Sequence, residues 1–205
     1  TGSAAIHHAQ ALIASGQARH VLAIGVEVMS ALPTREVGQA LLQACYVKEE
    51  LETPAGFAGM FAKLADAYAE RHGDPHPAMA RIAAKNHANG LHNPLAQLHL
   101  DVDAAFCDTE SDKNPRVIGR LLRSDCSPVS DGAAAVVLSA ANAHQRHDNA
   151  VRLRATAQAT DLMPLSRRDM SELAGTRTAW QRLMAKAGIT LQDLDLLETH
   201  DCFTI

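Results

Sequence analysis

The sequence DCSPVSDGAAAVVLS, residues 125–139, joins a polar turn to a run of alanines and then to a short apolar strand. Pro128 has a fixed φ and no amide donor, and residues 130–132 are turn formers that can expose backbone amides to a ligand. The alanines allow another backbone or a narrow ligand to come close, and residues 136–138 are typical of a strand buried on both faces. The stretch therefore predicts either a ligand-binding turn or a tight turn that leads into a strand of a packed core.

Cys126 lies at the start of this stretch, and a cysteine acts as a nucleophile where its surroundings favour the thiolate. A lone cysteine is more often a small buried hydrophobic residue. We therefore expect Cys126 to serve packing, and we keep the nucleophile as the alternative.

The composition indicates a globular, alanine-rich α/β protein. The chain has 205 residues, which is enough for one substantial core or two modest domains without disulfides or metals. Hydrophobic residues make up 47% of it but aromatic residues only 3%, so Ala, Val, Leu, Ile and Met must fill the core. The formal net charge is −4 and the Lys and Arg residues are scattered, so we expect no nucleic-acid partner.

The cysteines and the chain ends bear on the compartment and on completeness. No two cysteines form a Cys-x-x-Cys pair, which indicates a reducing, intracellular compartment, and we expect a cytoplasmic protein. The first apolar run, residues 4–14, is interrupted by two histidines and a glutamine, so we expect neither a signal peptide nor a membrane span. The chain starts at Thr1 and stops at Ile205 inside an apolar segment, and we expect both ends to be cut.

The hydrophobic pattern predicts the order helix, strand, insertion, strands, helix and strand, which indicates a layered α/β/α domain. Helical spacing predicts a helix over residues 4–14 that ends at Gly16, and another over residues 173–187 that ends at Gly188. A capping pattern at residues 190–193 precedes the last strand, and helices are expected to cover both sides of the first strand. Strands are predicted over residues 20–27, 117–122, 136–139 and 151–157, and residues 194–197 are expected to lead into a final core strand.

Residues 30–114 have a different character, because turn residues, an acidic patch and five of the 11 histidines interrupt short amphipathic helices. We interpret this region as an insertion. One apolar helical face is predicted over residues 60–68 and another over residues 79–86, with Pro75 and Pro77 between the two helices.

The sequence Lys-Asn-His-Ala-Asn-Gly, residues 85–90, joins the end of the second of these helices to a turn. It predicts helix termination, with a ligand contact as the alternative.

Histidine spacing does not favour a metal site. His72 and His76 are four residues apart, but Gly73 and Pro75 prevent the regular turn that would place both on one helical face. The phosphate-binding patterns GxGxxG and GxxxxGK are absent, so no nucleotide fold of those kinds is indicated.

The sequence Thr-His-Asp-Cys-Phe-Thr, residues 199–204, crowds polar and titratable groups at the end of a strand-like run. In an open α/β sheet this is where ligands meet the loops. His200 can donate a hydrogen bond to a developing oxyanion, and Asp201 can either hold this histidine or cap a following helix.

Five motifs together make the chain similar to the thiolase family over essentially its whole length. The more familiar thiolases carry Asn-Glu-Ala-Phe where this chain has His-Asp-Cys-Phe, so it most resembles the branch that contains the thiolase part of sterol carrier protein x. The motifs are Thr-Gly-Ser-Ala-Ala at residues 1–5, Gly-Val-Glu-Val-Met at 25–29, Lys-Asn-His at 85–87, the stretch 126–139, and His-Asp-Cys-Phe at 200–203.

This resemblance implies acyl transfer to and from coenzyme A by a cysteine nucleophile, as thiolysis of a 3-ketoacyl-CoA or as Claisen condensation of two acyl-CoAs. Such an activity belongs to lipid and fatty-acid metabolism and needs no cofactor, since coenzyme A is a substrate. The resemblance assigns His200 to the oxyanion hole and Ser127 to the pantetheine arm of coenzyme A, and it assigns no metal ligand.

The resemblance also implies that several catalytic groups lie outside the chain. The nucleophile of the family branch comes just ahead of a Thr-Gly-Ser like residues 1–3, and a second histidine and a second cysteine come after the His-Asp-Cys-Phe position. We therefore expect the chain alone to be inactive and its intact parent to be active.

The resemblance implies a layered thiolase-like α/β/α core, incomplete here, with an α-rich loop domain. Partners are expected to be acyl-CoA, coenzyme A and further copies in a homodimer or homotetramer. Two alternatives are kept: a ketoacyl synthase-type condensing enzyme, and a non-catalytic thiolase-like protein that binds CoA esters. The implied domains are residues 1–29 (end of the N-terminal core half), 30–114 (loop domain over CoA), 115–145 (return to that core half) and 146–205 (start of the C-terminal core half).

Overall fold

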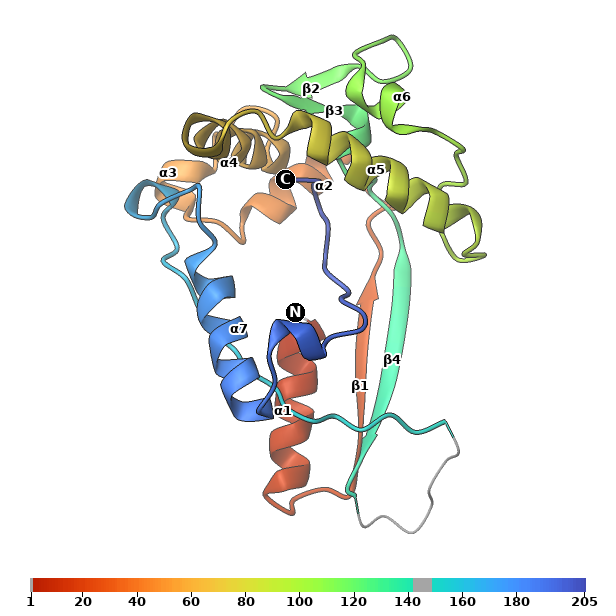
Figure 1. The fold of residues 1–205 in the computed structure, drawn as a ribbon, viewed down its shortest axis with the longest axis vertical. Coiled ribbons are helices and arrows are strands. Elements are labelled where there is room, and N and C mark those ends of the chain that lie inside the picture. Colours follow the sequence, from red (N-terminus) through yellow and green to blue (C-terminus); the bar gives the residue numbers. More distant parts are fainter. Residues whose placement is uncertain (1, 142–148) are drawn as a thin grey trace. The chain divides into compact units, whose positions relative to one another are not determined.

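The computed structural model describes residues 2–141 and 149–205, and both helices and strands occur in them (Figure 1). Thr1 and the expected domain boundary between residues 145 and 146 lie outside the described residues. The elements are α1 (Gly2–Ala14), β1 (His20–Glu27), α2 (Thr34–Leu42), α3 (Val47–Glu50), α4 (Phe57–His72), α5 (His76–Leu91), α6 (Ala104–Asp108), β2 (Arg116–Ile118), β3 (Leu121–Leu122), β4 (Gly132–Ser139) and α7 (Ala174–Ala187). Short 3₁₀ turns occupy Arg123–Asp125, Leu165–Arg167 and Leu191–Asp193.

The chain divides into two compact units. We call them the sheet unit and the helical unit after their main elements. The sheet unit contains Thr1–Met29, Asp131–Asp161 and Ala174–Leu197, and the helical unit contains Ser30–Ser130, Leu162–Leu173 and Glu198–Ile205.

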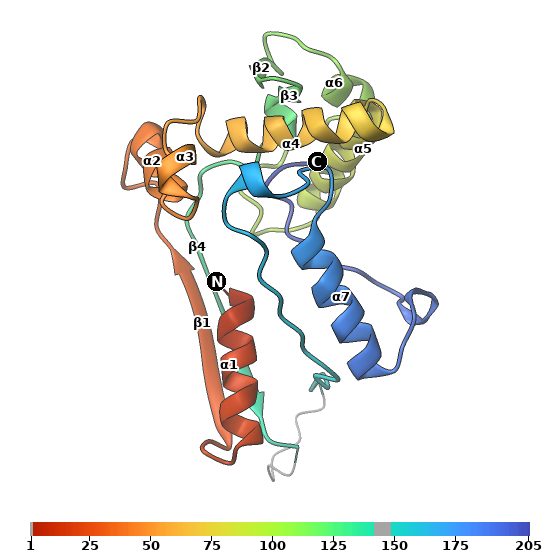
Figure 2. The same ribbon diagram turned by 90° about the vertical axis from the view of Figure 1, so that its left-hand side faces the viewer.

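In the sheet unit, β1 pairs antiparallel with β4 over their whole length, from His20 opposite Ser139 to Glu27 opposite Gly132. Helix α1 lies along one face of this pair (Figure 2). The predicted first helix and first strand are confirmed, and Gly16 has the positive φ of 75° that ends such a helix. Strand β4 starts earlier than predicted, because the alanines also pair with β1.

The prediction that both faces of the first strand are covered is wrong. Leu22, Ile24 and Val26 are 56%, 59% and 68% exposed, while their neighbours on the alternate face are more buried where α1 packs. Side chains of a strand alternate between two faces, so one covering helix shields only every second residue. The expected burial of residues 136–138 on both faces is wrong for the same reason, since Val137 lies opposite Leu22 and is 66% exposed.

Residues 151–157 form no strand, contrary to the sequence pattern, and the only described β-type pairing after residues 194–197 is the isolated bridge at Phe203. The segment 151–157 runs beside α7, and side chains of that helix bind the carbonyl of one of its residues and that of the residue after it. Lys186 donates to the carbonyl of Thr156 at 3.3 Å, and Arg182 donates to that of Gln158 at 3.0 Å. Alternation of apolar residues predicts a strand only where another strand supplies the hydrogen bonds, and no described strand pairs with residues 151–157.

The predicted helix end and cap after residue 187 are confirmed. Helix α7 stops at Ala187, and Gly188 follows with a φ of 63°. Asp193 then accepts hydrogen bonds from the backbone amide and the hydroxyl of Thr190, at 2.8 and 2.9 Å, which completes the predicted capping pattern.

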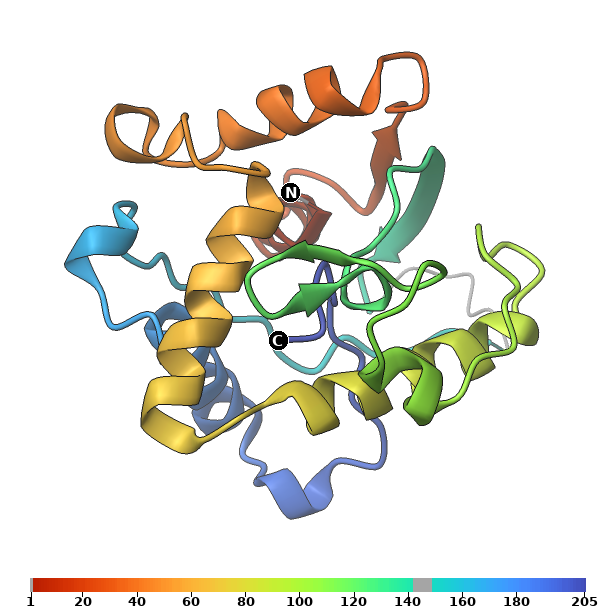
Figure 3. The same cartoon turned by 90° about the horizontal axis from the view of Figure 1, so that it is seen from above.

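In the helical unit, α4 and α5 and the β2–β3 hairpin enclose a small apolar core, and the C-terminal residues lie against it (Figure 3). Both predicted amphipathic helices are confirmed, with Pro75 immediately before α5 and Pro77 in its first turn. The buried members of the core are Ala62, Met79 and Leu121, and the partly buried residues around them are Phe61, Ile118, Cys126, Phe203 and Ile205.

The turn predicted at residues 89–90 is wrong, because α5 continues to Leu91. Gly90 lies inside this helix, where a Cβ atom would be 3.4 Å from the carbonyl oxygen of Leu98. The glycine thus allows the following loop to approach the helix closely, a purpose that the sequence alone does not distinguish from a turn.

We predict that Gly59→Ala destabilises the protein. A Cβ atom at Gly59 in α4 would lie 1.9 Å from the carbonyl oxygen of Pro54, so the backbone must shift. Overpacking of this kind lowers the free energy of unfolding by about 1–3 kcal/mol or more, which urea denaturation followed by circular dichroism would measure.

Gly38→Ala in α2 is the matched control, because no atom lies within 4 Å of its Cβ position. It should stabilise the protein by up to about 1 kcal/mol, since alanine favours the helix. Equal effects of the two substitutions would contradict the close packing at Gly59.

Candidate functional site

Two segments distant in sequence meet at the predicted site residues. Cys126 and Phe203 form an antiparallel bridge, which we call the 126–203 bridge. Beside it, the amide of Ser127 donates to the carbonyl of Cys202 at 3.0 Å, and the amide of Thr204 donates to that of Asp125 at 3.1 Å. The structure thus brings Ser127 and the His-Asp-Cys-Phe motif together within the helical unit.

The bridge separates an apolar face from a polar one. Cys126 and Phe203 pack on the core of the helical unit, and the rings of Phe203 and Phe61 stack with centroids 4.2 Å apart. Opposite residues of an antiparallel pair share a face and successive residues alternate, so Ser127 and Cys202 share the other face. On that face Ser127 is exposed and Cys202 is half-buried, so both can meet solvent or a ligand.

Asp125 anchors the bridge, and its carboxylate has no exposed surface. One oxygen accepts from the Thr204 hydroxyl at 2.7 Å, and the other accepts from the Leu122 amide at 2.8 Å. His76 lies 3.8 Å from the second oxygen and contacts Asp108 at 2.8 Å with its other ring nitrogen. A buried carboxylate is tolerated only with such partners, so Asp125 holds Thr204 firmly.

His200 itself is exposed and lies in irregular backbone. Its Nε2 atom is 2.8 Å from the Sγ atom of Cys202, and the direction of this hydrogen bond depends on the imidazole tautomer. If the thiol donates, the ring proton of a neutral imidazole is on Nδ1 and is available to a ligand oxygen. Cys202 therefore helps determine which edge of His200 can act as a donor.

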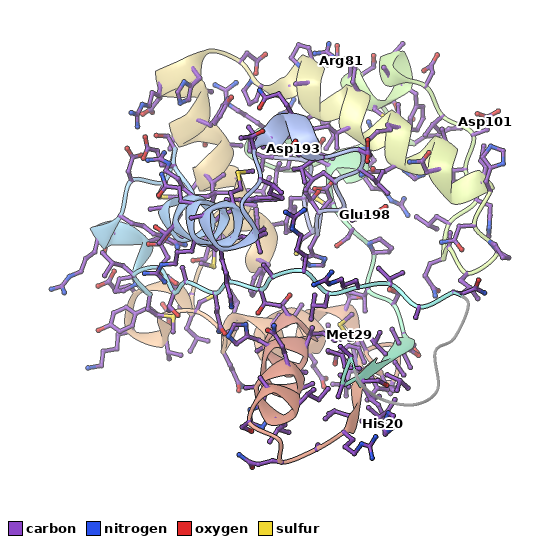
Figure 4. All side chains as sticks on the ribbon, turned by 60° about the horizontal axis from the view of Figure 1, so that its bottom comes forward. His20, Met29, Arg81, Asp101, Asp193 and Glu198 are labelled. Carbon is purple, nitrogen blue, oxygen red and sulfur yellow. The ribbon has the colours of Figure 1, made fainter. Side chains whose placement is uncertain are left out.

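Asp201 is held from α5. Its Oδ2 atom accepts a hydrogen bond of 3.1 Å from the amide of Asn86, whose own oxygen accepts from Lys85 at 2.7 Å. Figure 4 labels Glu198, where the chain enters this final segment of the helical unit. The Asp201 carboxylate is thus bound from α5 and by the Thr199 hydroxyl, and its expected contact with the imidazole of His200 is not found in the described residues.

The thiols at the bridge are poor nucleophiles in this structure. Burial, and secondarily the charge of Asp125, raise the pKa of Cys126 to about 11. Burial is also the main cause that raises the pKa of Cys202. Both are therefore protonated at neutral pH, and the packing of Cys126 in the core favours its interpretation as a structural residue.

The described residues contain no group of three or more His, Cys, Asp or Glu side chains that could hold a metal ion. His72 ends α4 and His76 starts α5, so the two histidines lie on different helices. Within residues 2–141 and 149–205, no helix combines the length and the apolar character that crossing a membrane requires.

The sequence did not reveal the residues that support the site. Asp125 looked like part of a turn, Asn86 like a helix end, and Cys202 like a neighbour of the histidine. The sequence shows only that each of these polar residues lies in or next to a motif. It does not show which distant residue each one contacts.

The fold and the site together define an α/β chain of the thiolase-like type. Residues 1–106 match the family described as "Thiolase, N-terminal domain". The chain belongs to the thiolase family, and its fold is that of the family.

Several known proteins resemble the chain. It is 33% identical over 210 residues to an acetyl-CoA acetyltransferase of Methanothermobacter thermautotrophicus, covering 100% of this chain and 52% of that protein. It is 29% identical over 224 residues to human sterol carrier protein 2, covering 100% of this chain and 39% of that protein. The crystal structure of a monomeric SCP2-thiolase like protein type 1 from Mycobacterium smegmatis matches 98% of this chain and 44% of its own, with a TM-score of 0.77 at 22% identity. The chain thus spans about half or less of the length of these proteins.

We predict that Cys126 is alkylated slowly in the folded chain. With the pKa raised to about 11, its thiolate fraction near pH 8 is about one hundredfold smaller than in the unfolded chain. Iodoacetamide labelling followed by peptide mass spectrometry should show this ratio, and the rate should rise as the pH approaches 11. Labelling of Cys126 at the unfolded-chain rate near pH 8 would contradict its burial.

Proposed function

We propose that the protein is a thiolase-type acyltransferase that acts on acyl-CoA, by thiolysis of a 3-ketoacyl-CoA or by condensation of two acyl-CoAs. The observation that carries this proposal is the 126–203 bridge in a chain of the thiolase family, because it places Ser127 beside the segment of His200. The similarity to acetyl-CoA acetyltransferases over the whole chain supports the same activity.

The proposed reaction needs a group that stabilises a negatively charged oxygen. In thiolysis a cysteine thiolate attacks the 3-keto carbon, the bond between C2 and C3 breaks, and the electron pair passes into the enolate of an acetyl-CoA. Protonation at C2 completes that product, and coenzyme A then takes the acyl group from the cysteine. His200 is exposed and fixed by Cys202, so it is suited to donate a hydrogen bond to the thioester oxygen of the enolate.

Binding of the pantetheine arm is assigned to Ser127. Its side chain shares the polar face of the bridge with Cys202 and is exposed, so a ligand on this face can contact both. Residues 30–114 are proposed to cover coenzyme A. No cofactor besides coenzyme A as substrate is proposed.

The oligomeric state and the cellular compartment of the protein are also proposals. The apolar face formed by Leu22, Ile24 and Val26 supports a homodimer or homotetramer, since exposed apolar patches of this kind mark interfaces. The Mycobacterium smegmatis protein is described as monomeric, so a monomer is the competing outcome. The cytoplasm stays the expected compartment.

A CoA-ester-binding protein without catalysis is the second candidate. Burial raises the pKa of the Cys126 and Cys202 thiols, so neither is ready to act as the nucleophile, and catalysis needs a different cysteine; a protein without one would only bind the ester. A ketoacyl synthase-type condensing enzyme is less favoured, because the His-Asp-Cys-Phe motif is typical of the sterol-carrier branch.

We predict that His200→Ala impairs turnover by the full-length gene product. Loss of one oxyanion donor should lower kcat for acetoacetyl-CoA thiolysis about one hundredfold to one thousandfold, with a small change in KM. The consumption of acetoacetyl-CoA measures the rate, and calorimetry with coenzyme A measures binding.

The calorimetric arm separates the two candidates. Binding of coenzyme A without any turnover by the unsubstituted protein would support the binding protein and refute the transferase. Wild-type kcat in the His200→Ala variant would remove this residue from the oxyanion hole.

We predict that Ser127→Phe weakens coenzyme A binding about tenfold or more, because a bulky ring fills the polar face of the bridge. Calorimetry on the full-length protein measures the dissociation constant. Cys126→Ala is the matched control on the opposite face, and it should lower the stability while leaving the affinity unchanged. If both variants bind coenzyme A with the same affinity, the pantetheine arm does not bind at Ser127.

A further inference from the structure

The Lys-Asn-His motif of α5 has no role in the reaction proposed above, yet it contacts the histidine segment. Lys85 donates to Asn86 at 2.7 Å, and Asn86 donates to Asp201 at 3.1 Å. We propose that Asn86 is a positioning residue that holds the turn formed by residues 200–202 in place for oxyanion stabilisation. The catalytic meaning of this inference rests on the proposed function, whereas the contact itself does not.

The orientation of the Asn86 amide follows from its neighbours. The Lys85 ammonium can only donate and the Asp201 carboxylate can only accept. The amide oxygen must therefore point to Lys85 and the amide nitrogen to Asp201, as observed. A hydrogen bond to a charged acceptor is stronger than one between neutral groups, so Asn86 is well suited to restrain Asp201.

Helix α5 gives Asn86 a rigid base. Met79 and Ala83 are buried and lie seven and three residues before Asn86, so all three share one side of the helix. Arg81, labelled in Figure 4, and Lys85 are exposed, which leaves Asn86 at the border between the buried and the solvent-facing sides. Groups carried by a packed helix hold a partner more accurately than groups in a loop.

The turn depends on such a restraint because it lacks regular structure. Residues 196–201 form neither helix nor strand, and the 126–203 bridge together with Asp125 holds the chain only from the carbonyl of Cys202 onward. The hydrogen bond from Asn86 fixes the chain directly after His200. The imidazole therefore lies between two anchored points.

The experiment reverses the direction of this hydrogen bond. Asn86→Asp places two carboxylates against each other, whereas Asp201→Asn alone keeps an acceptor oxygen for Asn86. The double variant Asn86→Asp with Asp201→Asn restores a donor and an acceptor, and it keeps the net charge. Asn89→Asp is the matched control, since Asn89 is exposed on the same helix and no side-chain hydrogen bond of it is found in the described residues.

Two readouts are compared for each variant. In the 205-residue chain, Cys202 should be alkylated about tenfold faster in Asn86→Asp, because the released turn opens more often. In the full-length protein, kcat for acetoacetyl-CoA thiolysis should fall about tenfold to hundredfold with KM changed less than about twofold. The double variant should return both values to near the wild type, and Asn89→Asp should change neither.

The outcomes separate this proposal from the proposed function. If no protein turns over substrate but the alkylation pattern is as expected, the function fails and the positioning contact stands. If Asn86→Asp labels like Asn89→Asp, or if the double variant restores neither value, the positioning role is refuted. Circular dichroism checks folding, and Asn86→Ala replaces Asn86→Asp if the latter unfolds, with the same expected rise in Cys202 labelling.

Discussion

The buried carboxylate of Asp125 is the constraint on which the candidate site depends. Moving a charged group out of water is costly unless hydrogen bonds replace the lost hydration, and here the Thr204 hydroxyl and the Leu122 amide do so. These partners come from two segments distant in sequence. The energetic need to satisfy one carboxylate therefore forces the end of the 3₁₀ turn and the chain around Thr204 to lie together.

The 126–203 bridge turns this constraint into an arrangement with one apolar and one polar face. Alternation along both segments sends Cys126 and Phe203 into the core and leaves Ser127 and Cys202 on the other face. Apolar burial thus supplies the stability, and the polar face is free to bind a ligand. A one-residue slip would exchange the two faces, so the partners of Asp125 also determine which side chains can meet a substrate.

The sequence predicted those parts of the fold that local physics determines. The helix ends at Gly16 and Gly188 need a left-handed backbone, which glycine adopts at little cost, and the Thr190 cap needs only residues three positions away. Strands were less predictable, because a strand exists only with a partner. Residues 151–157 alternate as a strand does, but no described strand pairs with them, and α7 contacts them through Lys186, which donates to the carbonyl of Thr156.

The same distinction between local and distant interactions applies to the candidate site. His200 and Ser127 could be proposed from motifs, since a motif reports residues that are close in sequence. Asn86 and Asp125 act across 115 and 79 positions of sequence, and no local pattern encodes which residue such a side chain will reach. A positioning role requires a long-range contact that orients a group with a role in the reaction, so it becomes visible only when the fold is known. The Lys-Asn-His motif illustrates this, because its sequence suggested a helix end, while the role proposed for Asn86 depends on its contact with Asp201.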